Sequence, residues 1–128
     1  MADGSTAGRE LDGLVAEKVM GWVEVALKPI ANAMGQHVID EWAGIAPEGT
    51  GRPSLVPRFS TMIQDAWPLI EKMRREFGFV TVISGKGPTG PQPWVCKVNR
   101  AGGFVEEKGE TAPLAICSAA LRAYAPGA

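Results

Sequence analysis

The chain has 128 residues, a net charge of −1 and a hydrophobic fraction of 45%, with 21% charged residues. This length and composition are typical of one folded domain with its own core. A near-neutral chain lacks the basic balance that most nucleic-acid-binding proteins need for phosphate contacts, which argues against a nucleic-acid partner. The start of the chain does not resemble a signal peptide, and no window approaches about 18 uninterrupted apolar residues. We therefore expect a cytoplasmic protein without membrane contact.

The two cysteines, Cys96 and Cys117, each lie inside an apolar run, with neither a C-x-x-C pair nor a nearby histidine. This pattern predicts two reduced thiols in the core of a cytosolic protein. A disulfide is the alternative.

Residues 1–8 are small and polar, so we expect a flexible N-terminus before a single domain over 9–125. Apolar residues then recur at helical spacing from Leu11 to Trp22 and predict a helix over 9–20, with Gly21 as its stop. The following segment, 23–58, is ambiguous. Its patterns fit either strands or a helix interrupted by Pro29.

Thr61 and Gln64 have the spacing of a capping box, and an apolar stripe begins at Ile63. We therefore predict a helix over 61–77, kinked at Pro68 and ended by Gly78. A helix that starts instead at Pro68 is the alternative.

The C-terminal half predicts strands over 79–84, 94–98 and 104–108, followed by a helix over 112–124 with Pro113 in its first turn. Short connections favour antiparallel pairing in one curved sheet, with the three helices packed on it. The side chains that we expect to be buried are Trp22, Trp67, Val82, Cys96, Ile116 and Leu121.

Several short motifs follow one another in a recognisable order. They are EKVMGW at 17–22, FST at 59–61, DAW at 65–67, EKM at 71–73, WVCK at 94–97 and TAPLAICSAAL at 111–121. Together they resemble the phage ABA sandwich domain, a family of small phage and prophage proteins, over roughly 9–22 and 50–125. The resemblance implies a three-layer α/β/α sandwich of the mixed α/β (α+β) class and a phage origin, but no settled activity. Between Val23 and Gly49 the chain departs from the family pattern.

The sequence offers only weak candidates for catalytic or metal-binding residues. His37, Asp40 and Glu41 form H-x-x-D-E, but a metal site would need further ligands at suitable spacing. No serine has a G-x-S-x-G setting, and adjacent carboxylates such as Glu106 and Glu107 point to opposite faces of a strand. We therefore expect no enzyme activity, no metal and no cofactor, with a minor hydrolase using His37 as a remote alternative.

The glycine- and proline-rich stretch 85–93 contains Lys86 but lacks the following Ser or Thr and helix of a phosphate-binding loop. We predict a nine-residue hairpin loop, with Lys86 free to close over an anion bound elsewhere. A basic patch of Lys72, Arg74, Arg75, Lys97 and Arg100 is a weaker hypothesis than ordinary solvated charge.

The main functional hypothesis is a non-enzymatic phage accessory protein that binds and neutralises a host factor. The target is a host protein, bound through 26–45, or an anionic signalling nucleotide sequestered at the interface of a homo-oligomer. The alternative is a small nucleic-acid-binding accessory protein. An anion would need cations and aromatic surfaces, and the candidates are Arg52, Arg58, Lys86, Arg100, Trp42 and Trp94.

Overall fold

The computed structural model describes residues 8–31, 33–47, 51–87, 90–100 and 103–125. Of the N-terminus expected to be flexible, 1–8, residues 1–7 lie outside this range. In chain order the elements are α1 (Arg9–Lys18), β1 (Val23–Ala31), β2 (His37–Ile45), β3 (Ser54–Leu55), α2 (Ile63–Phe77), β4 (Val80–Gly87), β5 (Gly90–Arg100), β6 (Gly103–Gly109) and α3 (Ala112–Ala123). None of the described helices is long and apolar enough to cross a membrane.

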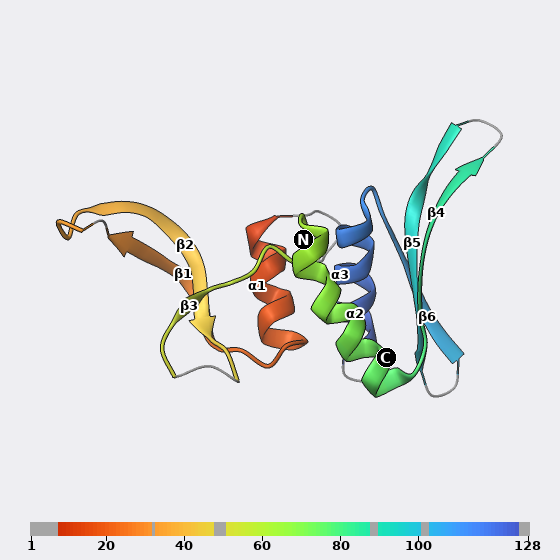
Figure 1. The fold of residues 1–128 in the computed structure, drawn as a ribbon, viewed down its shortest axis with the longest axis horizontal. Helices are drawn as coiled ribbons and strands as arrows, with labels where there is room; N and C mark the ends of the chain where they lie inside the picture. Colours follow the sequence, from red (N-terminus) through yellow and green to blue (C-terminus); the bar gives the residue numbers. More distant parts are fainter. Residues whose placement is uncertain (1–7, 32, 48–50, 88–89, 101–102, 126–128) are drawn as a thin grey trace.

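The strands form two separate antiparallel sheets, with orders β1-β2-β3 and β4-β5-β6. The three helices lie between the sheets (Figure 1). The predicted mixed class with antiparallel pairing is confirmed, whereas the α/β/α layering implied by the resemblance is not. The expectation that all three helices pack on β4–β6 is wrong for α1. In the described part of the chain, α1 packs on α3 and on β1 and β2, because the first sheet covers its other side.

The first part of the ambiguous segment 23–58 forms a hairpin of two nine-residue strands, β1 and β2, so the strand alternative is correct there. Pro29 fits within β1 because β1 is the edge strand of its sheet, where a missing N–H does not break a second ladder. The hairpin projects beyond the helices (Figure 1). We refer to this β1–β2 hairpin as the arm.

The predicted capping box at the start of α2 is wrong. The helix begins at Ile63, and its cap residue, Met62, makes no side-chain capping bond. Pro68 does lie inside the helix, and Gly78 ends it with a left-handed φ of 91°, as predicted. At α3, Thr111 caps the helix by accepting a hydrogen bond from the Leu114 N–H, and Pro113 lies in the first turn.

The strands of the second sheet are longer than predicted, and the prediction of a nine-residue loop between β4 and β5 is wrong. The β4–β5 ladder continues through Gly85↔Gln92 and Lys86↔Pro91 to Gly87↔Gly90. β6 pairs with β5 only as far as Trp94↔Gly109. Beyond Trp94 the ladder therefore has two strands, and both are edges that tolerate proline.

The core gathers apolar side chains of the three helices, β5 and β6. Cys96 and Ile116 are buried, as predicted, and both cysteines are free thiols. Trp22, Val82 and Leu121 pack against the core but are only partly buried. The prediction for Trp67 is wrong, since its side chain is 52% exposed. The buried stripe of α2 includes Leu69, which places Trp67 and Ile63 on the solvent side; the stripe is Ala66, Leu69, Ile70 and Met73.

Candidate functional site

The six residues proposed for an anion site fall into two groups on different sheets. Trp42 lies in β2, Arg52 lies in an exposed position between β2 and β3, and Arg58 lies in an exposed position between β3 and α2. Trp94 lies in β5 of the second sheet and packs against the core. With the helices between the two sheets (Figure 1), Trp42 and Trp94 belong to different surfaces.

The second group consists of Trp94, Lys86 and Arg100. Its two cations, Lys86 and Arg100, are also far apart. Lys86 pairs with Pro91 near the tip of the β4–β5 hairpin, and Arg100 pairs with Gly103 at the opposite end of β5. At about 3.3 Å per residue, Pro91 and Arg100 are separated by roughly 30 Å. The side chains of Lys86 and Arg100 lie outside the described part of the structure. One copy of the chain therefore does not bring the six residues into one small-molecule site.

Trp42 instead takes part in a close contact between the arm and α1. A Cβ placed on Gly13 would lie 2.8 Å from Cε3 of Trp42 and 3.2 Å from its Cζ3. Gly13 thus lets the indole approach the helix backbone more closely than any other residue would allow. The glycine costs about 1 kcal/mol of helix propensity, and the close packing of Trp42 explains why it is present.

Beside this contact there is a cleft of about 510 Å³ between α1 and the arm. Its helix side consists of positions i, i+3, i+4 and i+7 of α1, and its sheet side consists of two residues. The lining residues are Glu10, Gly13, Leu14, Glu17, Val25 and Trp42. Its volume lies in the usual range for small ligands or single side chains. The charged lining is entirely acidic.

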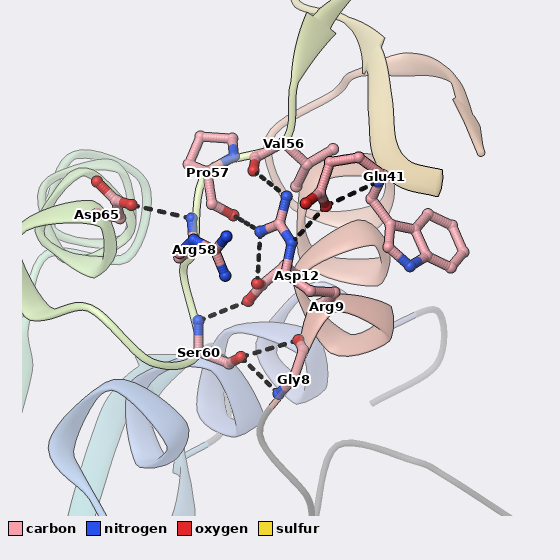
Figure 2. A network of polar contacts seen from close by, with 10 residues as sticks. Gly8, Arg9, Asp12, Glu41, Val56, Pro57, Arg58, Ser60 and Asp65 are labelled. Carbon is pink, nitrogen blue, oxygen red and sulfur yellow. Dashed lines mark hydrogen bonds and ion pairs between the residues drawn. The ribbon is translucent and has the colours of Figure 1, made fainter. Parts of the chain in front are cut away.

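A network of polar contacts centred on Arg9 joins α1 to the base of the arm (Figure 2). The Arg9 Nε donates to Glu41 Oε1 at 2.8 Å, and its Nη1 donates to Asp12 Oδ2 at 2.8 Å. Nη1 and Nη2 also donate to the carbonyls of Pro57 and Val56, at 3.2 and 2.6 Å. The guanidinium thus holds β2 and the segment after β3 against α1.

Asp12 is fully buried and links Arg9 to the segment before α2. Its Oδ1 accepts the backbone N–H of Ser60 at 2.7 Å. The Ser60 hydroxyl accepts the Gly8 N–H and donates to the Gly8 carbonyl (Figure 2). Ser60 is therefore occupied by the start of α1, which gives it a structural role rather than that of a nucleophile.

Glu41 and Arg58 show the electrostatics at the base of the arm. The hydrogen bond from Arg9 holds the pKa of Glu41 below its usual value of 4.5, with help from the Trp42 N–H. Arg58 lowers the same pKa through its charge. The backbone N–H of Arg58 donates to Asp65, but its guanidinium has no partner among the described residues (Figure 2). It is the exposed cation nearest to the arm in this network.

Other charged residues that the sequence analysis considered form ion pairs within the protein. Lys72 binds Glu76 at 2.6 Å, and Lys97 lies 3.7 Å from Glu106, so two members of the suggested basic patch are paired. Glu107 binds Arg122 of α3, which confirms that Glu106 and Glu107 point to opposite faces of β6. The side chain of His37 lies outside the described part. Across the described residues, no three histidine, cysteine or acidic side chains gather as metal ligands.

Sequence reasoning missed both the Arg9 network and the acidic cleft. The cleft had a readable signal, because Glu10, Gly13, Leu14 and Glu17 share one face of a helix by their spacing. A glycine and two acids at these positions are unusual for a core-facing stripe. Apart from the Arg9–Asp12 pair, which is three residues apart, the network had no local signal, because its other contacts between segments span 32 to 52 residues.

Comparison with known proteins adds the family. The chain resembles a solved phage protein from Bacillus cereus ATCC 14579, with a TM-score of 0.61 and 25% identity over 94% of this chain and 93% of that one. No curated protein matches the chain. The model of the phage ABA sandwich domain matches residues 13–121, which span most of the sequence. The chain therefore belongs to the phage ABA sandwich domain family.

Proposed function

We propose that this phage protein is a non-enzymatic accessory protein that binds and neutralises a host protein in the bacterial cytoplasm, using the arm as its contact surface. The observation that carries the proposal is the exposure of apolar side chains on the arm. Leu27 is 53% exposed and Ile39 is 51% exposed. Both lie on strands, where a purely structural hairpin would bury such side chains on at least one face.

The exposure involves both faces of the arm. Leu27 is opposite Trp42 in the β1–β2 register, and Ile30 is opposite Ile39. Residues three apart on a strand point to opposite faces, so Leu27 and Ile39 are presented on different sides. The arm projects away from the helices (Figure 1), which leaves room for a partner to contact both sides. Exposed apolar residues on both faces of a projecting hairpin support its use as a protein-interaction surface.

A sequestered nucleotide is the second form of the proposal, and one specific feature favours it. The Arg58 guanidinium is exposed and has no partner among the described residues. The distant Lys86 and Arg100 would join it only from a second copy, so this form requires a homo-oligomer. A host protein needs no such assembly, and the arm therefore favours the protein target. With two cations of the basic patch already paired, a nucleic-acid partner has less support than either.

The test compares two double variants that remove similar exposed apolar groups. The protein would be used to capture partners from a bacterial lysate, and each captured partner would then be purified and titrated by calorimetry. We expect Leu27→Ser/Ile39→Ser to weaken binding at least about tenfold, because a few buried residues carry most of the energy of a typical interface. The control, Ile83→Ser/Phe104→Ser on the second sheet, should bind like wild type. Unchanged binding by the arm variant would contradict the proposal.

The nucleotide form has its own readout. Protein-free extract of infected cells would be added to the protein, and its melting temperature would be followed. A ligand at 100 times its dissociation constant would stabilise the protein by about 2.7 kcal/mol. A shift that disappears in Arg52→Ala/Arg58→Ala/Lys86→Ala, while the melting of the free protein stays unchanged, would favour nucleotide sequestration over a protein target.

A further inference from the structure

The geometry points to a specific recognition site at the base of the arm: the acidic cleft accepts one basic side chain, an arginine or lysine, of the protein partner. This inference rests on the proposed function and adds the chemistry of the contact. It concerns Trp42, Glu10 and Glu17, which enclose the cleft of about 510 Å³. The sequence alone suggests Trp42 as a surface for an anionic ligand, whereas the acidic cleft assigns it a cationic one.

The spacing on α1 brings the two carboxylates to the same face of the helix. Glu10 and Glu17 are seven residues apart, which is about 10.5 Å along the helix axis and nearly two full turns. Gly13 and Leu14 lie between them, and the Trp42 indole packs on Gly13 and lines the cleft beside it. A guanidinium or ammonium group that enters between the carboxylates would therefore be within a few ångströms of an aromatic ring.

The two carboxylates are available for a partner. Glu10 and Glu17 are both exposed, and neither forms an ion pair or hydrogen bond in the described part of the chain. Two other acids near the base of the arm are already used, since Arg9 binds both Asp12 and Glu41. Lys18 follows Glu17 and lies one turn after Leu14, so it flanks the cleft without lining it. The lining residues thus carry negative charge without any compensating cation.

The aromatic residue determines which ligand class fits. A cation over the face of a tryptophan is attracted by the ring, and arginine also stacks on it with its planar guanidinium. An anion would be repelled by Glu10 and Glu17, and a wholly apolar group would leave both carboxylates without a partner. Leu14 and Val25 would contact the aliphatic stem of a long basic side chain, which buries its methylene groups readily.

The cleft also lies next to the exposed part of the arm. Trp42 is opposite Leu27 in the β1–β2 register, so the two side chains share a face of the sheet. A partner that covers Leu27 would therefore pass over the cleft. The combination predicts a partner segment with an apolar residue beside a basic one.

The test uses a short acetylated and amidated peptide with one central arginine, and a matched peptide with citrulline, which has the same shape without the charge. The four tryptophans give separate indole N–H signals in a nitrogen-proton spectrum, and Trp42→Phe assigns the relevant one. We expect the arginine peptide to move the Trp42 signal and the citrulline peptide to move it much less. Equal shifts from both peptides, or no shift from either, would overturn the inference.

Charge-neutral variants localise the effect. Glu10→Gln/Glu17→Gln should weaken binding of the arginine peptide about tenfold, because it removes the charge and keeps the size of both side chains. The control Glu71→Gln/Glu110→Gln changes the net charge equally at exposed positions outside the cleft and should bind normally. If both double variants bind alike, the cleft is not the site.

The same variants separate this inference from the proposed function. If Glu10→Gln/Glu17→Gln keeps full affinity for a captured host protein while Leu27→Ser/Ile39→Ser loses it, the arm binds the partner but the cleft does not accept a basic residue. If the arm variant keeps full affinity, the proposed function itself is wrong, whatever the peptide titration shows.

Discussion

The two ends of the molecule are built by different interactions. At one end α2 and α3 pack on β4–β6, and their facing side chains, such as Leu69, Met73 and Ile116, are fully buried. At the other end the arm contacts α1 through one indole packed on a glycine and through the Arg9 network (Figure 2). Half-exposed apolar residues, including Leu27 and Ile39, remain in contact with water here, as Ile83 and Phe104 do on the second sheet.

This difference separates folding from recognition. Burial of apolar surface is the main favourable term in folding, so the end with the buried side chains supplies most of the stability. The arm buries little and is positioned by a few directional contacts at its base. Its apolar side chains can therefore serve a partner at little cost to the fold. The predictions below test this division, from the largest expected effect to the smallest.

The same substitution at the two ends should have very different consequences. Leu69→Ala removes a fully buried side chain and leaves a cavity, which should cost about 2–5 kcal/mol of unfolding free energy. Leu27→Ala removes a side chain that is 53% exposed and should cost less than about 1 kcal/mol. Urea unfolding of both variants measures this directly. Equal losses would show that the arm contributes to the core as much as α2 does.

Asp12 tests the polar attachment between the two ends. Asp12→Ala leaves the buried Ser60 N–H without its acceptor and removes one partner of Arg9, which should cost about 1–3 kcal/mol. The loss should be below that of Leu69→Ala, because Arg9 keeps Glu41 and two backbone carbonyls. The control is Asp65→Ala, which removes an exposed hydrogen bond to the Arg58 N–H. A larger loss in the control than in Asp12→Ala would contradict this assignment.

How well the sequence predicts each end follows from the same division. The helices and the second sheet were predictable because their signals are local: Thr111 caps α3, Gly78 ends α2, and β-branched residues mark β4. The burial of Trp67 was mispredicted because the period of a helix does not say which of two neighbouring stripes faces the core. That choice depends on α3, which packs against α2 from far along the chain.

The arm was ambiguous because alanine, proline and short apolar runs fit a strand or a helix equally well. Pairing between Leu27 and Trp42 or Ile30 and Ile39 resolves the ambiguity, and such pairing is tertiary information. The candidate anion site was proposed without the same tertiary information. Arg52, Arg58 and Lys86 were grouped by residue type and loop location, whereas the fold separates Lys86 from the two arginines. Only the i, i+3, i+4, i+7 pattern of the cleft on α1 could have been read in advance.

Glu41 gives the smallest and most specific effect, because it tests the attachment of the arm through pH. The bond from Arg9 lowers the pKa of Glu41 in the folded protein below its usual value of 4.5, so the fold favours the ionised carboxylate. This contribution is present above the unfolded pKa and is lost as the pH falls through the lowered folded pKa. Glu41→Gln should cost about 0.5–1 kcal/mol at neutral pH, since the pair is partly exposed to solvent.

The difference between wild type and Glu41→Gln should therefore shrink as the pH falls below 4.5 and vanish once Glu41 is protonated in the folded state. Urea unfolding of both proteins across this pH range measures it. Glu110→Gln, at an exposed position with no ion pair among the described residues, provides the pH control. A pH-independent difference for Glu41→Gln would mean that Glu41 acts through its shape and hydrogen bonding alone. The charge of Arg9 would then not be what holds the arm to α1.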